Sequence, residues 1–459
     1  MKFGLDGALG RKIVTLAAPT VGAMISQTMI NNADHLMVAR IDGPDAIAGQ
    51  AALGPALAMM WMVGGSLSAI AVGTQALTAR RFGEKDELGA GRVLTNSTLI
   101  SLILGTLASL IFVLLAPHMF PLLNRDPNVL RVGIPFLQWR YAAVLSMAVT
   151  ASYKSFFDGV GKTKVHFVVA VAMNIMNFIL NYGLIFGHLG MPKMGVAGSG
   201  LASCISSYFG CFIIIGWSLR HKYAGRFHPY RMANLTPGLR REIARLSAPS
   251  GLAVVVSLIG FAVFYKVCDR LDADAHNSQA IFLSATTNII NIFMLVFISC
   301  MAYGTATATL VGQAMGAGNE NLAERSAKEA AKLGFLFFSL MGALTVVFAH
   351  DILNFWCHGQ PEVLAVAVPI LRVLGAFEPF VCVALVFINA LYGAGDSRFV
   401  MLVELTLHLF CLMPLSYVLG IAAGFGLWGV WAAMIAYVVL MSAIMTWKFQ
   451  VGSWKAIKI

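Results

Sequence analysis

The chain has 459 residues, of which 58% are hydrophobic and only 12% are charged. Soluble globular domains average about 45–50% apolar and about 25% charged residues, so this composition excludes an ordinary soluble protein and leaves no room for a soluble domain. The formal net charge of +11 would suit a nucleic-acid-binding protein. The basic residues, however, gather in alternate loops between apolar runs, as membrane topology requires. We therefore expect no nucleic-acid partner.

Apolar runs long enough to cross a bilayer recur along the whole chain. A membrane-spanning helix needs about 20 residues, and scanning for such runs gives about twelve. The sequence therefore predicts an all-α integral membrane protein with twelve transmembrane helices. The expected spans cover residues 13–36, 47–76, 93–117, 130–156, 165–187, 195–219, 245–267, 280–310, 331–356, 363–392, 399–423 and 427–449.

The two halves of the chain carry similar motifs in the same order. KIVTLAAPT corresponds to EIARLSAPS, which aligns Pro19 with Pro249, and DPNVLRVGIPFL corresponds to QPEVLAVAVPIL, which aligns Pro135 with Pro369. Each half has six spans, so we expect two parallel, pseudo-symmetric six-helix lobes around a central cleft, the architecture of a secondary transporter. The predicted parts are an N-terminal lobe (1–219), a basic cytoplasmic linker (220–244), a C-terminal lobe (245–450) and a cytoplasmic tail (451–459).

The first span carries a stripe of polar residues. Gln27, Asn31 and Asp34 are separated by four and then three residues, so they share one face of a helix. A charged side chain at bilayer depth costs roughly 2.5 kcal/mol or more, so it should face a protein cavity rather than lipid. One interpretation is that Asp34 lies near the helix end and simply meets water. The functional interpretation is that Asp34 anchors a cation or proton site, lined by Gln27 and Asn31.

Several other patterns indicate no further chemistry. The seven cysteines form no CxxC pair, so neither a zinc site nor a redox motif is expected, and Cys357 beside His358 is interpreted as loop sequence. The segment GVGKTK lacks the GxxxxGK[ST] spacing of a phosphate-binding loop, so transport should draw on an ion gradient rather than ATP. An integral-membrane enzyme would need paired acids or histidines, and the nearest candidates look like a solvated loop: Asp269, Asp272 and Asp274.

A set of short motifs points to one family. The first helix opens with LxxP, from Leu16 to Pro19, and carries an acid near its end. The turns RRFGE and QAMGAGN follow the second and eighth spans, DGVGKTK and YGAGDSR follow the fourth and tenth, and the fifth contains NFILN. In this ordered set the chain resembles the multidrug and toxic compound extrusion (MATE) transporters over nearly its whole length. The resemblance implies export of amphipathic, often cationic organic compounds in exchange for Na⁺ or H⁺, with no other cofactor.

The resemblance also implies a site in the first lobe. Asp34 matches the first-helix acid of the family, and Gln27 matches a polar position two turns earlier. Asn177 and Asn181 match a pair in the fifth helix, the second of which is Asp in some members, so a site with two carboxylates is not expected here. Any metal would be Na⁺ at Asp34. Further polar side chains would complete the pocket: Lys154, which would pair with Asp34 or Asp158, together with Ser199 and Ser203.

The second lobe departs from the family pattern. Members of one bacterial branch carry Glu in the seventh helix and Asp in the tenth, where this chain has Ser257 and Val381. Glu378 and Glu404 remain, either as accessory site residues or as internally paired structural charges.

An alternative function within the same superfamily is a flippase for a lipid-linked saccharide. Such proteins tend to line the cleft with arginines, and buried arginine is sparse here.

The distribution of Lys and Arg places both termini in the cytoplasm, in a multi-pass protein of the inner membrane. We expect a monomer that contacts membrane lipids and a small organic substrate.

Overall fold

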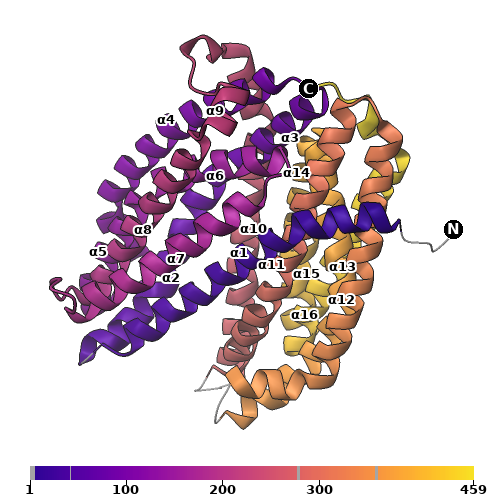
Figure 1. Ribbon diagram of the computed structural model, residues 1–459. Helices are drawn as coiled ribbons and strands as arrows, with labels where there is room; N and C mark the ends of the chain where they lie inside the picture. The colour runs from indigo at the N-terminus through magenta and orange to yellow at the C-terminus, as the bar shows by residue number, and fades with distance from the viewer. Residues whose placement is uncertain (1–5, 42, 276–279, 357–359) are drawn as a thin grey trace. The chain divides into compact units, whose positions relative to one another are not determined.

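The computed structural model describes residues 6–41, 43–275, 280–356 and 360–459. In this part of the chain, twelve helical segments are long and apolar enough to cross a membrane, which confirms the predicted all-α membrane fold. Cys357 and His358 lie outside the described residues. The helices (Figure 1) are α1 (Gly7–Ala39), α2 (Pro44–Ser68), α3 (Ile70–Gly83), α4 (Glu87–Met119), α5 (Pro127–Ala142), α6 (Val144–Gly159), α7 (Lys164–Phe186), α8 (Gly195–Ser218), α9 (His221–Phe227), α10 (Pro237–Asp274), α11 (Ile281–Gly316), α12 (Glu320–Trp356), α13 (Pro361–Ala394), α14 (Ser397–Leu407), α15 (Met413–Tyr417) and α16 (Gly426–Val451).

Most helices extend beyond the apolar runs that predict them. α1 begins at Gly7 rather than at residue 13, and α10 begins at Pro237 rather than at residue 245. Hydropathy detects only the part of a helix that is apolar enough for lipid, whereas backbone hydrogen bonding continues through polar turns at the ends. The span Ser397–Ala422 is interrupted by two π-helical stretches, His408–Leu412 and Val418–Ala422.

Contacts divide the chain into two compact units. Of the described residues, the N-unit comprises those within 18–254 together with Ile459, and the C-unit comprises those within 6–17 and 255–458. Both boundaries fall within long helices, α1 and α10, so the predicted linker 220–244 belongs to the N-unit. The predicted lobe boundaries follow the sequence repeat, whereas this division groups residues by packing.

Within the N-unit, the helices pack through small residues. α8 packs against α5 and α7, while α6 packs against α3 and α4 (Figure 1). At the α5–α8 contact, a Cβ atom on Gly200 would lie 2.9 Å from the carbonyl oxygen of Phe136. Such close backbone approach is typical of membrane helices, which associate through packing rather than through the hydrophobic effect.

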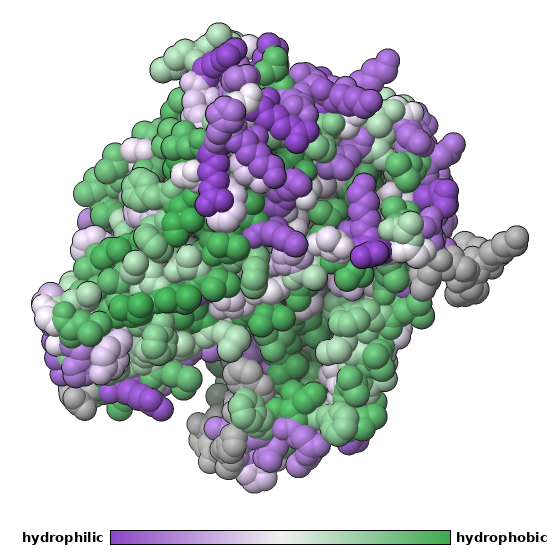
Figure 2. Space-filling view, viewed as in Figure 1, coloured by the Kyte–Doolittle hydropathy of each residue, from purple (hydrophilic) through white to green (hydrophobic). Residues whose placement is uncertain are grey.

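The basic segment after α8 is folded onto α4. α9 places Phe227 in a buried position, and the Arg226 guanidinium donates to the Glu87 carboxylate, which raises the pKa of Arg226. The Asn96 side chain donates to the carbonyl of Asn234 at 2.8 Å and accepts from the backbone N–H of Thr236 at 3.1 Å. This segment is therefore an ordered cap on the N-unit. Figure 2 shows hydrophilic residues gathered around it.

Large apolar side chains are exposed along the lengths of the helices (Figure 2). This is the surface expected of helices that contact lipid. α4 gives one such band: Leu102, Ile103, Leu104, Leu107, Leu110, Ile111, Leu114 and Leu115.

The C-unit is built around α13, which packs extensively against α11 and α12. α12 and α13 approach closely at two glycines: a Cβ atom on Gly342 would lie 2.1 Å from the carbonyl oxygen of Gly375. Any larger residue must push these helices apart.

We expect Gly342→Ala to lower the free energy of unfolding by about 1–3 kcal/mol, because it overpacks a tight helix crossing. Thermal unfolding of the purified protein in detergent measures the effect. Gly54→Ala in α2 is the matched control, since a Cβ there meets nothing within 4 Å, and it should be neutral or stabilising by up to about 1 kcal/mol. Equal melting temperatures for the two variants would contradict this account of the α12–α13 contact.

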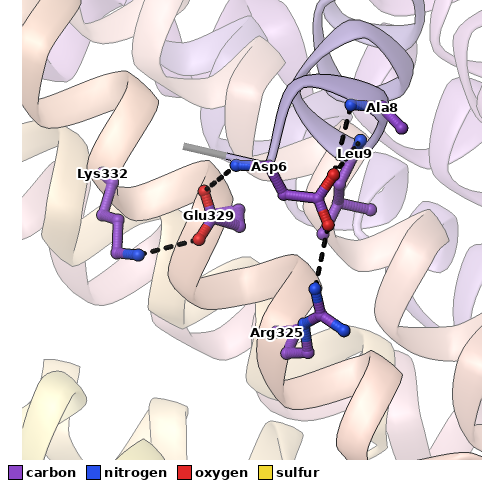
Figure 3. A network of polar contacts seen from close by, with 6 residues as sticks. All are labelled: Asp6, Ala8, Leu9, Arg325, Glu329 and Lys332. Atoms are coloured by element: carbon purple, nitrogen blue, oxygen red, sulfur yellow. Dashed lines mark hydrogen bonds and ion pairs between the residues drawn. The ribbon is translucent and has the colours of Figure 1, made fainter. Parts of the chain in front are cut away.

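The first turn of α1 is fixed to α12 within the C-unit (Figure 3). Asp6 caps α1, because its Oδ1 accepts from the backbone N–H groups of Ala8 and Leu9 at 3.2 Å each, as N-cap residues do. Its other carboxylate oxygen accepts from Arg325 at 2.9 Å, and its backbone N–H donates to Glu329 at 3.3 Å. The start of α1 thus belongs to the C-unit, whereas the residues from Ala18 onward belong to the N-unit.

Pro19 and Pro249 both lie deep inside their helices. α1 begins twelve residues before Pro19, and α10 begins twelve residues before Pro249. Neither proline is therefore in a first turn, where it would serve only to start the helix. Each removes a backbone donor from the helix interior, close to the residue at which its helix passes from one unit to the other.

Candidate functional site

Asp34 lies in the last third of α1 and is partly buried against α7. The Nδ2 atom of Asn181 donates to Oδ1 of Asp34 at 2.5 Å, and it also lies 3.0 Å from Oδ1 of Asn177 one turn earlier. Asn181 is completely buried, and its own Oδ1 has no hydrogen-bond partner among the described residues. The Asn181 amide therefore donates a hydrogen bond to the Asp34 carboxylate, and the unpaired Oδ1 of the same amide lies beside it.

A second layer of polar contacts positions this pair of asparagines. Asn177 donates through Nδ2 to the hydroxyls of Ser203 and Ser206 on α8, at 3.3 Å each. Both serines are buried, as is Asn177, so these bonds fix the face that α7 presents to α1. Gln27 donates to Asn31 along α1 at 3.4 Å. The spacing of the polar stripe thus places all three of its members on one helix face.

A polar cavity of about 320 Å³ opens beside Asp34, lined by residues of the N-unit alone. Its volume falls within the range of about 300–1,000 Å³ that small-molecule sites occupy. A carboxylate, several amides and hydroxyls, and a few apolar side chains meet there. The lining residues are Gln27, Ile30, Asn31, Asp34, Trp61, Ser68, Ala71, Arg140, Ser146, Met147, Thr150, Ala151, Lys154, His166, Met173, Asn174, Asn177, Ser203, Ser206 and Ser207.

The cavity brings together most of the residues predicted for the first lobe. Asn181 lies behind Asp34 rather than on the cavity wall, and Ser199 is buried away from the lining with no hydrogen-bond partner for its hydroxyl among the described residues. Lys154 lines the cavity, and its electrostatic neighbours are Asp158 and His166. Among the described residues, Lys154 interacts electrostatically with Asp158 and forms an ion pair with neither Asp158 nor Asp34.

Sequence reasoning missed the role of Arg140 in this site. Arg140 comes from the last turn of α5, lines the cavity and interacts electrostatically with Asp34. The signal was present, because a charge near the middle of a predicted span marks a functional position by default. His166, Asn174 and Ser206 also line the cavity, and no local motif distinguishes them from ordinary packing residues.

The two candidate acids of the C-unit, Glu378 and Glu404, are not among the residues that line this cavity. Glu378 on α13 is 2% exposed and accepts a hydrogen bond from the Thr345 hydroxyl of α12 at 2.8 Å. Glu404 on α14 does not meet His408 through its carboxylate; Nδ1 of His408 contacts the backbone oxygen of Glu404 at 2.8 Å. Neither residue belongs to the group around Asp34.

Comparisons with known proteins agree on one family. A family model described as MatE matches residues 19–183 and 249–418, well over half of the chain. The multidrug resistance protein PmpM of Pseudomonas aeruginosa is 25% identical, with 93% of this chain and 88% of that protein covered. The multidrug resistance protein NorM of Burkholderia vietnamiensis is 26% identical, with 95% and 92% covered.

Solved structures show the same fold. An outward-facing structure described as a multidrug resistance MATE family transporter of the MOP superfamily superimposes with a TM-score of 0.88 at 20% identity, covering 99% of this chain and 98% of that one. A MOP superfamily transporter from Pyrococcus furiosus gives a TM-score of 0.87 at 20% identity, with the same coverage. The two matches of the family model begin at Pro19 and Pro249, the two prolines that the sequence repeat aligns.

Proposed function

Because this chain belongs to the MATE family of membrane transporters, and is thus not an enzyme, we propose that it is a secondary antiporter that exports organic compounds. The exported compounds are amphipathic and carry a cationic group, and the exchanged ion is Na⁺ or H⁺. The relatives named as multidrug resistance proteins support multidrug efflux. Asp34 is the residue at which the ion or proton binds, with Asn177 and Asn181 holding its carboxylate in place.

The observation that carries this proposal is the position of Asp34 on the wall of a polar cavity. A carboxylate inside a membrane span is costly unless a cation or a proton neutralises it. In one cavity, a cationic substrate and the coupling ion compete for the same carboxylate. Release of one therefore accompanies binding of the other, which is the condition for exchange when access to the cavity alternates between the two sides.

A sodium ion would find oxygen ligands at this place. The Asp34 carboxylate, the free Oδ1 of Asn181 and the neighbouring serine hydroxyls are hard oxygen donors, whereas a proton needs only the carboxylate. The donor set therefore suits either ion, and the two are distinguished by imposed gradients rather than by geometry.

Topology follows from the distribution of charge. Lys and Arg gather in alternate loops and at the helix ends beside them, including the last turn of α3, with Arg80 and Arg81, and the segment around α9. By the positive-inside rule these loops face the cytoplasm, and both termini lie on that side of the inner membrane.

The proposed function is tested by reconstituting the purified protein in liposomes and following flux of a fluorescent organic cation under imposed gradients. With dye at the same concentration inside and outside, exchange predicts net dye movement in the direction opposite to ion flow down an imposed Na⁺ or H⁺ gradient, and no net dye movement without that gradient. Dye movement that ignores both gradients would contradict antiport, and a requirement for a lipid-linked saccharide would favour the flippase.

We expect Pro19→Ala to lower turnover several-fold while leaving ion affinity nearly unchanged. A proline deep in a helix removes one of the backbone hydrogen bonds of that helix. The part of α1 that carries Asp34 can then tilt relative to the first turns of α1. The measurement is the transport rate in proteoliposomes at saturating gradient, alongside ion binding. Pro249→Ala is the matched control, and it should be milder because α10 carries no acid at the position equivalent to Asp34. A turnover for Pro19→Ala equal to that of wild type would contradict this role of α1.

A further inference from the structure

The start of α7 and the end of α8 lie side by side at one membrane interface. The two helices are consecutive spans that pack against each other in the N-unit. Gly210 faces Met173 across this hairpin, because a Cβ atom on Gly210 would lie 3.1 Å from the Met173 sulfur. Following both helices by equal lengths from this pair, towards the start of α7 and the end of α8, brings Lys164 level with Leu219.

Four cationic side chains belong to this interface, and we call them the basic cluster: Lys162, Lys164, Arg220 and Lys222. All four are exposed, and among the described residues none of them forms an ion pair or a side-chain hydrogen bond. The turn before α7 lies against α9, because the Lys162 N–H donates to the carbonyl of Phe157 at 2.7 Å, and the Phe157 ring meets the Tyr223 ring edge-on with 5.2 Å between centroids. The backbone thus gathers four unpaired positive charges.

The basic cluster lies at the edge of an apolar surface. The Arg220 guanidinium carbon is 3.9 Å from the centre of the Trp217 ring. Tryptophan is enriched at membrane interfaces, and an arginine stacked on it stays there without an acidic partner. Further along the hairpin, large apolar side chains are exposed: Val168, Ile175 and Phe212. A ligand of this surface therefore needs an anionic group at the interface and an apolar part beside the helices.

The C-unit neutralises the equivalent position internally. The turn DGVGKTK of the N-unit aligns with YGAGDSR, which places Asp396 where the N-unit has Lys162 and leaves Arg398 as the counterpart of Lys164. Asp396 pairs at 3.2 Å with Lys448 in the last turn of α16. The positive-inside rule counts Lys and Arg in both halves alike, so it does not explain why the N-unit leaves this turn unpaired.

We propose that the basic cluster and the apolar surface beside it bind an anionic phospholipid. The phosphate and headgroup are held by Lys164 and Arg220, with Lys162 and Lys222 beside them, and the acyl chains lie along α7 and α8. Phospholipid joins both required features, because its phosphate oxygens accept from guanidinium and ammonium donors while its chains cover apolar side chains. A zwitterionic headgroup fits less well, since its ammonium would lie next to like charges.

The bound lipid also stabilises the helix pair that it joins. A ligand that binds the folded protein and not the unfolded one raises the temperature of unfolding by mass action. α7 and α8 carry Asn177, Asn181 and Ser203, which position Asp34, so the lipid holds the helices on which the candidate site is built. This inference does not depend on which ion is exchanged or which compound is exported.

The test measures the affinity of the purified full-length protein, in non-ionic detergent, for its first bound lipid by native mass spectrometry. The two probes are dioleoyl phosphatidylglycerol and dioleoyl phosphatidylcholine, which share their acyl chains and differ in headgroup charge. Each Lys or Arg at a membrane surface strengthens the binding of anionic lipid about fivefold. Wild type should therefore bind phosphatidylglycerol at least about tenfold more tightly than phosphatidylcholine.

Lys164→Gln combined with Arg220→Gln should bring the two affinities to within about threefold. Lys162→Asp, which gives this turn the acid that the C-unit has at Asp396, should also lower the preference. Arg11→Gln combined with Lys12→Gln is the matched control, because both side chains are exposed on α1, outside the hairpin, and neither is paired among the described residues. It removes the same charge and should retain the full preference.

Binding of phosphatidylcholine and thermal unfolding in its presence show that each variant is folded. Phosphatidylglycerol should raise the melting temperature of wild type and of the control further than phosphatidylcholine does, and should not do so for the Lys164→Gln, Arg220→Gln variant. Three outcomes would overturn the inference: no preference in wild type, full preference in that variant, or an equal loss in the control. Displacement of the lipid by glycerol 3-phosphate at the same concentration would also overturn it, because the apolar surface would then contribute nothing.

Discussion

Asp34→Asn should abolish gradient-driven efflux while expression and folding remain intact. The substitution keeps the shape of the side chain and removes the charge on which affinity for a cation or proton depends. Asn181 Nδ2 can still donate to the amide oxygen of the new side chain, so the local packing of α1 on α7 should survive. Dye flux in proteoliposomes, with thermal unfolding measured on the same preparation, checks both parts of the expectation.

The matched control for Asp34→Asn is Asp126→Asn. Asp126 is exposed, lies in the N-unit and caps α5 by accepting from the backbone N–H of Asn128 at 2.8 Å. Asparagine caps helices about as well as aspartate does, so this variant removes the same charge at no cost to the fold and should transport normally. Normal efflux by Asp34→Asn would contradict a role of Asp34 in ion or proton binding. It would support the alternative interpretation, in which Asp34 lies near the helix end and simply meets water.

The second large effect is expected from the asparagines of α7. Asn181→Ala removes the donor that holds Asp34, and Asn177→Ala disconnects the pair from Ser203 and Ser206. Asn181→Ala takes away both a hydrogen bond to a charged group, which contributes about 1.5–3 kcal/mol, and the oxygen ligand that its Oδ1 offers to a cation. Na⁺ affinity should therefore fall about tenfold or more in Asn181→Ala, and less in Asn177→Ala. The concentration of Na⁺ that gives half-maximal dye flux measures this affinity.

Glu404→Ala provides the comparison for these variants. Glu404 lies in the C-unit, and its contact with His408 runs through the backbone. Its removal should disturb coupling less than either substitution on α7. Equal or reversed effects would move the ion site to the C-unit.

The fold could be predicted from sequence because lipid imposes a simple rule. Apolar runs of spanning length must be helical, so composition and hydropathy were enough for the twelve spans. The polar ends of α1 and α10 escaped prediction, because the rule concerns only residues inside the bilayer. The repeat that aligns Pro19 with Pro249 was visible in the sequence, and the family model matches the chain twice from those two positions.

The site was predictable only in part. The i, i+4, i+7 spacing of Gln27, Asn31 and Asp34 shows that the three side chains share one face of a helix, because helix geometry alone determines this. Which residues of other helices meet that face depends on tertiary packing. Ser199 and Ser203 therefore could not be told apart from sequence: Ser203 reaches the cavity, and Ser199 does not.

The central claim is that substrate and ion exchange through Asp34, and the most direct test is to drive the ion with the substrate. Liposomes containing the protein are loaded with an organic dye and a pH- or Na⁺-sensitive reporter, then diluted into dye-free buffer with no ion gradient. Antiport predicts that outward dye flux drives H⁺ or Na⁺ inward in wild type and not in Asp34→Asn. Ion movement in the same direction as the dye, or dye efflux with no ion movement, would contradict the account.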